Sequence, residues 1–336
     1  MRTERFVPIK SPVTGGRVKE VFDVEEKEFR KEKFRVHVRY YMCVDTGEQF
    51  TTAEQDELFC NDLYSQYRNT HNMPFPDEIK SIRERYGLNY AQLSKIMGFG
   101  INQWKSYEEG NVPSESNAKL ILTVRRKDGM MKLLKESRPS FEDREYARIV
   151  SRIESACDYA DSKAEDFLFY GNTKRGLLNG FSPLDCRKLK AMVCYIISKA
   201  GSGICPTKLN KEMFYADFRH FVKSGHSISG LNYRAIQYGP VPEHFDTIYD
   251  NIEGIEKIRT ISYDKESVSL VPGNMDSIDY GDVLGEDELS TLDEVTSEFA
   301  GMKTMEVVAK SHEEIAWIEN NDSHGIIPYS YAYLLK

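Results

Sequence analysis

The segment from 89 to 110 constrains the fold of this chain most strongly, because it combines a helix start, a tight turn and a second helix in close succession. Asn89 is a favourable first cap for a helix, and Gln92, three residues later, can complete a capping box. Gly98 and Gly100 follow where that helix should end, and glycine relieves the strain of a tight turn. The segment therefore predicts two helices joined by a short turn, which is the arrangement of a helix-turn-helix.

The second helix is predicted over 101–108, with one side in the core and the other exposed. Trp104 and Tyr107 lie three positions apart, so both rings are expected to pack inward together. The polar residues that remain are candidates for reading bases in the major groove of DNA: Asn102, Gln103, Lys105 and Ser106. Asn and Gln can bond the edge of adenine, and Lys can reach guanine or a phosphate.

Three cationic residues near this segment are candidates for contacts with the DNA backbone: Lys95, Arg125 and Arg126. Such contacts position a protein on the duplex without reading its sequence. A helical hairpin that folds and packs without binding DNA is the alternative interpretation.

Charge is distributed unevenly along the chain. The formal net charge is −8, yet residues 76–136 hold 11 Lys/Arg and 8 Asp/Glu, whereas residues 271–322 hold 14 Asp/Glu and 2 Lys. Such asymmetry suggests separate partners for separate segments. Solvated helix faces are the simpler interpretation of the acidic stretch.

The hydrophobic pattern predicts a mainly α fold with a small β-rich N-terminal domain, a helix-turn-helix, and a larger helical domain that carries a short β-hairpin. Residues 34–42 alternate between two faces, as in a half-buried strand, and residues 257–271 suggest the hairpin. Three domains are predicted, over 1–70, 76–137 and 142–336.

No constellation of residues indicates catalysis, a metal or a cofactor. The 6 cysteines form no C-x-x-C pair, and no two histidines stand at H-x-x-x-H spacing. We therefore predict a protein that is not an enzyme, with reduced thiols, in the cytoplasm. The N-terminus resembles no signal peptide and no run of about 18 apolar residues occurs, so no membrane partner is expected.

The first half of the chain resembles MqsA-type antitoxins within the wider Xre-like class. The resemblance rests on residues 98–110 and on two N-terminal segments, 11–16 and 43–48, which occupy the positions of two C-x-x-C pairs in the zinc domain of that family. Only Cys43 remains of four thiolates, so no zinc is expected, because structural zinc requires four N or S donors. The resemblance places the DNA-reading Asn of the family at Asn102.

The second half resembles the SocA-like Panacea antitoxin domain over roughly 160–325. The residues that carry this resemblance are Phe214-Tyr215-Ala216-Asp217, Gly225, Tyr238-Gly239-Pro240-Val241-Pro242, Ser311-His312-Glu313-Glu314 and Trp317. Gly239–Pro242 is expected to form a rigid turn between a strand and a helix.

The two resemblances together imply the antitoxin of a type II toxin–antitoxin system. Its C-terminal domain would bind a cognate protein toxin, and its helix-turn-helix, as a homodimer, would bind operator DNA and repress the operon. The expected toxin-binding residues are an aromatic group and an acidic group: Phe214, Tyr215, Phe218, Phe221, Asp287, Glu288 and Asp293. Two alternatives stay open: a transcriptional repressor of a mobile element without a toxin partner, and an adaptor that delivers a toxin to a protease.

Overall fold

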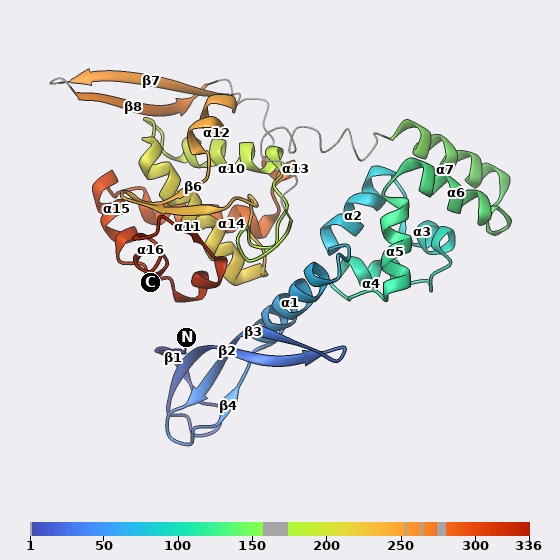
Figure 1. The fold of residues 1–336 in the computed structure, drawn as a ribbon, viewed down its shortest axis with the longest axis horizontal. Helices are drawn as coiled ribbons and strands as arrows, with labels where there is room; N and C mark the ends of the chain where they lie inside the picture. The colour runs from blue at the N-terminus through green and yellow to red at the C-terminus, as the bar shows by residue number, and fades with distance from the viewer. Residues whose placement is uncertain (1, 157–173, 253, 263–264, 274–279) are drawn as a thin grey trace. The chain divides into compact units, whose positions relative to one another are not determined.

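The computed structural model describes residues 2–156, 174–252, 254–262, 265–273 and 280–336 (Figure 1). Its contacts divide the chain into two compact units that do not follow chain order. The first unit comprises residues 1–27, 35–62 and 173–336, and the second comprises residues 28–34 and 63–172. The N-terminal sheet and the C-terminal half of the chain therefore belong to the same unit. The three-domain division remains a proposal about how the chain is organised.

The N-terminal sheet has four strands in the order β1-β2-β3-β4: Thr3–Lys10, Arg17–Phe29, Glu32–Cys43 and Gln49–Phe50. The alternation predicted over 34–42 is confirmed in β3, where Phe34, Val36 and Tyr40 are buried. Strands β2 and β3 extend into the charged run that follows Val24. The chain turns between them at Arg30 and Lys31, which both have positive φ.

Helix α1 (Ala53–Thr70) follows the sheet and begins with the capping box that Thr52 and Gln55 form. The Thr52 amide donates to Gln55 Oε1 at 3.0 Å, and the Gln55 amide donates to Thr52 Oγ1 at 3.3 Å. Two orphan N–H groups of the first turn are thereby satisfied by side chains only three residues apart.

The described residues of the second unit form six further helices and one 3₁₀ turn: α2 (Pro76–Arg85), α3 (Tyr90–Met97), α4 (Gln103–Glu108), α5 (Glu115–Val124), α6 (Lys127–Glu136), η1 (Arg138–Ser140) and α7 (Asp143–Ser155). These helices share one apolar core. We predicted that the C-terminal domain begins at 142, but Phe141, Ile149 and Ile153 are buried in this core. Helix α7 therefore packs with α2–α6, because the apolar side of its strongly amphipathic sequence is covered there.

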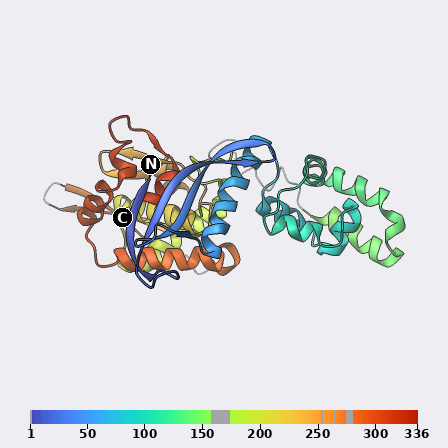
Figure 2. The ribbon, with the colours of Figure 1, turned by 90° about the horizontal axis from the view of Figure 1, so that it is seen from below.

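The C-terminal half is built around α11 (Pro206–Ser224), whose side chains are buried along most of its length. The helices around it are α10 (Cys186–Lys199), α12 (Phe245–Asn251), α13 (Tyr280–Val283), α14 (Glu286–Phe299), α15 (Thr304–His312) and α16 (Ile315–Ile318). Figure 2 shows this half from below, with α14 along one side and the N-terminal strands in front.

Two small sheets complete this half. Strands β5 (Tyr233–Ile236), β6 (Gly239–Pro242) and β9 (Ile326–Ile327) form one sheet in the order β6-β5-β9, and a 3₁₀ segment, η2 (Tyr329–Leu334), follows β9. Strands β7 (Ile255–Ser262) and β8 (Lys265–Pro272) form the hairpin predicted over 257–271, which is confirmed. The predicted mainly α fold with a β-rich N-terminus is confirmed. Among the described residues, no helix is long and apolar enough to cross a membrane.

Candidate functional site

The turn between α3 and α4 is set by local chemistry. The Gln92 amide donates to Asn89 Oδ1 at 2.9 Å, and the Asn89 amide donates to Gln92 Oε1 at 3.2 Å, so the predicted capping box is confirmed. Helix α3 ends at Gly98, which adopts the left-handed conformation with φ of 67°. Glycine tolerates this conformation because it has no Cβ.

The inner side of α4 is fixed to α2 by a polar cluster around Glu108. Trp104 is fully buried, and its Nε1 donates to Glu108 Oε1 at 2.8 Å. Arg83 of α2 donates to both oxygens of the same carboxylate, from Nε at 2.7 Å and from Nη2 at 3.0 Å. This bidentate pair, supported by an indole N–H, holds the short helix in one orientation.

The outer side of α4 carries the predicted base-reading residues, in two different situations. Asn102 is the exposed N-cap residue, and its side chain makes no cap hydrogen bond. Lys105 is exposed and pairs with Glu109 at 3.4 Å. Ser106 is half-buried and accepts a hydrogen bond from Asn111 Nδ2 at 2.7 Å, so its hydroxyl is already engaged.

Two further features of this outer side concern the start of the helix. Helix α4 begins at Gln103, which is half-buried, rather than at residue 101. Ile101, just before the N-cap, is 78% exposed and was not predicted as a contact residue. An apolar residue left in water beside an N-cap is the signal that could have found it, because apolar side chains can contact the methyl group of thymine.

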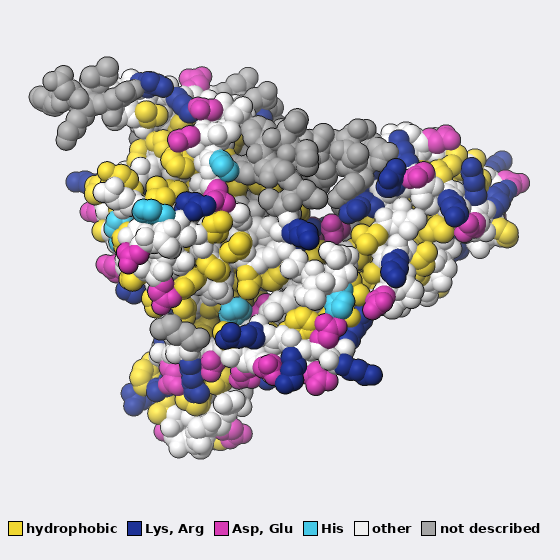
Figure 3. Space-filling view, in the orientation of Figure 1, with side chains coloured by type: hydrophobic (Ala, Val, Ile, Leu, Met, Phe, Trp, Pro, Cys, Tyr) yellow, Lys and Arg dark blue, Asp and Glu magenta, His cyan; other side chains and the backbone are white. Residues whose placement is uncertain are grey.

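The predicted backbone-contacting cations also differ in exposure. Lys95 is exposed, with Nζ 5.3 Å from the centre of the Phe141 ring. Arg126 is exposed and lies 3.4 Å from Asp128. Arg125 is half-buried, and its carbonyl accepts from Arg85 at 2.9 Å. On the face drawn in Figure 3, many Lys and Arg side chains lie over the helices of the second unit, with acidic side chains among them.

The two N-terminal segments that resemble zinc-binding loops have the same backbone conformation. The Ser11 amide donates to the Gly16 carbonyl at 3.0 Å, and the Cys43 amide donates to the Glu48 carbonyl at 2.9 Å. Gly15 and Gly47 have φ values of 74° and 73°. The paired loops are therefore folded as a matched set, although their side chains differ from four thiolates.

The side chains in these loops surround one thiol with hydroxyl groups. Cys43 is buried, and hydrogen bonds from Ser11, then Thr14 and Thr46, lower the pKa of its thiol to about 6. Thr14 Oγ1 lies 3.4 Å from the sulfur and donates to Asp45 at 2.7 Å. One thiol with three hydroxyls does not fit structural zinc, which takes N and S donors. In the described part of the chain, no group of three or more His, Cys, Asp or Glu side chains could hold a metal ion.

The aromatic group predicted to bind a toxin is corrected by the structure. Phe214, Tyr215, Phe218 and Phe221 are fully buried in the first unit. The rings of Phe214 and Phe218 lie 4.2 Å apart, and Phe218 stacks on Tyr329 of η2 at 4.3 Å. The helix that carries them is covered by elements from distant parts of the chain, so these side chains form the core and present no surface to a partner.

The acidic group predicted to bind a toxin is only partly available. Glu288 is buried and accepts from Lys188 at 2.6 Å. Asp293 is exposed but accepts from Tyr195 and Lys199, both at 2.8 Å. Asp287 is exposed, and no described residue lies within ion-pair distance of its carboxylate. Asp287 is therefore the acidic residue of this group with an uncompensated charge.

The signature residues around Gly239 meet in one buried cluster. Lys211 is fully buried and donates to the Pro240 carbonyl at 2.8 Å, and burial lowers the pKa of its ammonium group to about 7. Gly239 has φ of 91°, and an added Cβ would lie 2.4 Å from Ser311 Oγ and 2.6 Å from Lys211 Cε. The rigid turn predicted over 239–242 is wrong, because these residues form strand β6, paired with β5.

Two further contacts tie this cluster to the C-terminal helices. Trp317 Nε1 donates to the Ile236 carbonyl at 2.8 Å, and the rings of His312 and Trp317 stack at 3.9 Å. Asp217 is also buried and accepts from Tyr233 at 2.7 Å and from the Ile228 and Ser229 amides. These positions are thus explained by packing and hydrogen bonding within the fold.

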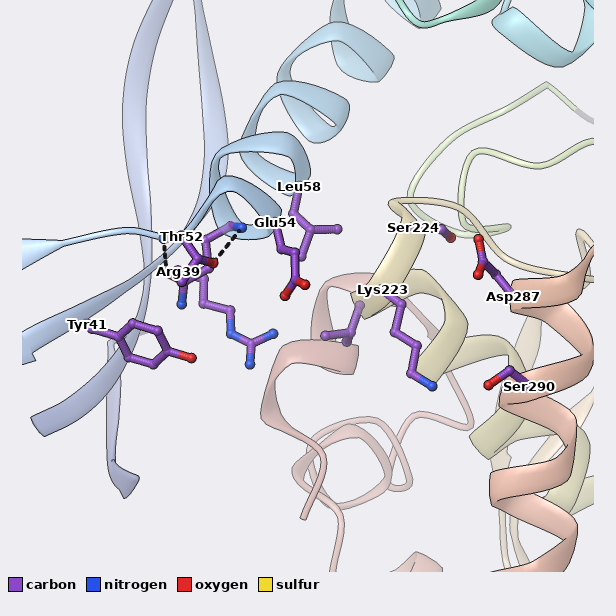
Figure 4. Close-up of a pocket in the computed structure, with 11 residues that line it drawn as sticks. Arg39, Tyr41, Thr52, Glu54, Leu58, Lys223, Ser224, Asp287 and Ser290 are labelled. Atoms are coloured by element: carbon purple, nitrogen blue, oxygen red, sulfur yellow. Dashed lines mark hydrogen bonds between the residues drawn. The ribbon is translucent and has the colours of Figure 1, made fainter. Parts of the chain in front are cut away.

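A cleft of about 520 Å³ lies within the first unit, between the N-terminal elements and the helices α11 and α14 (Figure 4). One wall holds Arg39, Tyr41, Thr52, Glu54, Gln55 and Leu58, and the other holds Val222, Lys223, Ser224, Asp287 and Ser290. The sequence predicted Asp287 as a contact residue. The sequence did not predict that residues near the start of α1 line the same cleft as Asp287.

Two regions of the chain match families of bacterial antitoxins. Residues 13–138 match the family described as the antitoxin component of bacterial toxin-antitoxin system, MqsA. Residues 209–318 match the family described as antitoxin SocA-like, Panacea domain. Each match covers less than half of the chain and says what that region is similar to.

The chain thus contains one region similar to MqsA antitoxins and one region similar to the SocA-like Panacea domain. Both resemblances predicted from the sequence are confirmed. Comparison with curated proteins and comparison with solved structures each gave no match.

Proposed function

We propose that this protein is the antitoxin of a type II toxin–antitoxin pair, acting by binding and without catalysis. The observation that carries the proposal is the joint presence of two antitoxin regions in one chain. The MqsA-type region would act on DNA and the Panacea domain on a protein toxin. The separate charge character of residues 76–136 and 271–322 supports this division of labour.

The DNA-binding part of the proposal rests on α3 and α4, which act as a helix-turn-helix. The inner side of helix α4 is fixed to α2 by the hydrogen bonds that Trp104 and Arg83 donate to Glu108. It therefore presents Asn102 and Lys105 to the major groove with little loss of conformational freedom, and Lys95, Arg125 and Arg126 contact phosphates. A homodimer on an inverted repeat would repress the operon, because two-fold protein symmetry matches two half-sites.

The toxin-binding part of the proposal rests on the first unit, which holds the Panacea domain. Its aromatic core supplies rigidity, so the contact surface is sought among exposed residues such as Asp287. An acidic surface would speed association with a basic partner, an effect that weakens with ionic strength.

The proposal is tested by co-expressing the chain with the product of the adjacent gene. We expect that gene to arrest growth alone and the chain to restore growth. Failure of the chain to restore growth, while it still binds the DNA upstream of its own gene, would instead favour a repressor without a toxin partner. Toxin levels that recover only in a protease-deficient strain would favour an adaptor for proteolysis.

A further inference from the structure

The turn between α3 and α4 carries two large apolar side chains, and only one of them is part of the core. Phe99 packs on the core of the second unit, with its ring centroid 6.4 Å from that of Trp104 and 6.0 Å from that of Tyr107. Ile101 is 78% exposed, more than any other large apolar side chain among the described residues. In the described part of the second unit, it is also the only such side chain that is exposed. The Ile101 side chain therefore contributes little to the stability of the fold itself.

The backbone around Ile101 is fixed by hydrogen bonds, although its side chain lies in water. The hydroxyl of Ser94, a buried residue of α3, donates to the Ile101 carbonyl at 3.3 Å. The Gln103 amide donates to the Gly100 carbonyl at 2.9 Å. A Cβ added at Gly98 or at Gly100 would meet no atom within 4 Å beyond the adjoining residues, so the surface of the turn is open. The Ile101 side chain thus stands at a defined place with room for a partner beside it.

The surroundings of Ile101 favour DNA as that partner. Residues 76–136 hold 11 Lys/Arg and 8 Asp/Glu, a charge balance that suits a polyanion. Asn102, the next residue, is exposed, and its side chain makes no cap hydrogen bond, so its amide can pair with the edge of an adenine. In the major groove, the apolar group on a base edge is the C5-methyl of thymine. An apolar side chain beside a carboxamide therefore matches a thymine beside an adenine.

We propose that Ile101 is a specificity-determining residue, which contacts the C5-methyl group of one thymine in each half-site of the operator. The thymine lies next to the base that Asn102 reads. The contact adds base recognition to a surface on which the hydroxyl of Ser106 is already engaged by Asn111. This inference deepens the proposed function and rests on its DNA-binding part.

Replacing single thymines with uracils tests the contact, because uracil pairs with adenine as thymine does and lacks only the methyl group. The probe is the DNA upstream of the chain's own gene, in which footprinting with the full chain first locates the protected segment. Each thymine of that segment is then replaced in turn, and the Kd is measured by gel-shift titration. At one thymine of each half-site, we expect uracil to weaken binding roughly fourfold, the effect of exposing one buried methyl group.

Two variants make the same truncation at two exposed isoleucines. Ile101→Ala removes the apolar contact, and we expect it to abolish the preference for thymine over uracil at that position and at no other. Ile258→Ala shortens an exposed side chain of β7 in the first unit, and it should leave the preference intact. Because the Ile101 side chain is exposed, its variant should keep the melting temperature of the unaltered chain.

Three results would overturn the role of Ile101 and leave the DNA-binding function standing. Binding that is insensitive to every thymine methyl excludes the contact. An equal loss with uracil in the Ile101→Ala variant assigns the methyl to another residue. A shift of that variant toward monomer in sedimentation, with the preference for thymine kept, places Ile101 at a contact between copies of the chain. Absence of DNA binding by the unaltered chain, in contrast, would contradict both this role and the DNA-binding part of the proposed function.

Discussion

The imidazole ring of His37 stacks on the phenol ring of Tyr333, with centroids 5.0 Å apart and planes inclined by 19°. His37 lies in β3, and Tyr333 lies in η2 near the C-terminus. Asp62 of α1 supports the stack by accepting from the His37 amide at 2.8 Å. The N-terminal sheet thus packs against the last segment of the chain within one unit.

Replacing Tyr333 with Ala should destabilise the first unit. Tyr333 also contacts Phe22 and Phe221, so its loss removes three ring contacts at once. We expect the free energy of unfolding to fall by about 2 kcal/mol, measured by denaturant titration. Tyr333→Phe keeps the ring and should be nearly neutral. A loss of equal size in both variants would show that the hydroxyl, and not the stack, is responsible.

Replacing Glu108 with Ala should loosen α4. The change leaves Trp104 Nε1 and Arg83 without their shared acceptor, and the Glu108 side chain is only 6% exposed. The expected loss is about 2–3 kcal/mol in thermal unfolding. Glu109→Ala is the matched control, because its partner Lys105 is exposed and such pairs contribute about 0.2–1 kcal/mol. Similar losses of stability in the two variants would contradict the role of Glu108 in fixing α4 to α2.

Replacing Asn102 with Ala should abolish binding to operator DNA. Its exposed side chain makes no cap hydrogen bond, so the change should leave the melting temperature unaltered. Loss of one bidentate base contact weakens specific binding by about 1–3 kcal/mol, and a dimer loses two such contacts. Gel-shift titration measures binding to operator DNA, and growth rescue measures neutralisation of the toxin. Loss of both activities together would refute the division of labour.

Replacing Gly239 with Ala should destabilise the first unit more than most Gly to Ala changes. The residue has φ of 91°, and the new methyl group would collide with Ser311 and Lys211. A loss of at least about 2 kcal/mol is expected from backbone strain and overpacking. Gly301→Ala is the control, because nothing lies within 4 Å of an added Cβ there. Chemical denaturation of both variants decides the prediction.

Stability should rise with pH above neutrality because of Lys211. Burial lowers the pKa of its ammonium group to about 7 from an ordinary value of 10.5, so between these pH values the unfolded chain binds the extra proton. The free energy of unfolding therefore gains up to about 1.4 kcal/mol per pH unit in this window. Lys211→Met should remove that gain when unfolding is measured between pH 7 and 10. An unchanged slope in the variant would assign the effect to other groups.

Local chemistry made the α3–α4 segment predictable from the sequence. The capping box at Asn89 and Gln92, the left-handed Gly98 and the burial of Trp104 each depend on residues within one or two turns of the chain. On α3 itself, Leu93 and Ile96 are buried whereas Ala91 is exposed. Which side of a short helix is covered depends on the neighbouring helices. The sequence of the helix alone does not specify where those helices pack.

Burial on α11 shows the limit of the same reasoning. An aromatic group such as Phe214 and Phe218 is compatible with a core and with a docking surface, and the sequence alone does not separate the two. Tyr329, more than a hundred residues away, lies against Phe218 in the structure and makes it core. The outcome depends on tertiary packing, because burial is a property of everything that surrounds a side chain.

The sequence by itself determined the two family resemblances, the caps, the turn at Gly98 and the mainly α composition of the chain, because these depend on short-range patterns and on motifs. Only the tertiary structure decided that the N-terminal sheet belongs with the C-terminal half, and that Glu54 stands opposite Asp287 across one cleft. The physical reason is that charge compensation and burial arise between residues far apart in the chain. No spacing or periodicity in the sequence records such pairs.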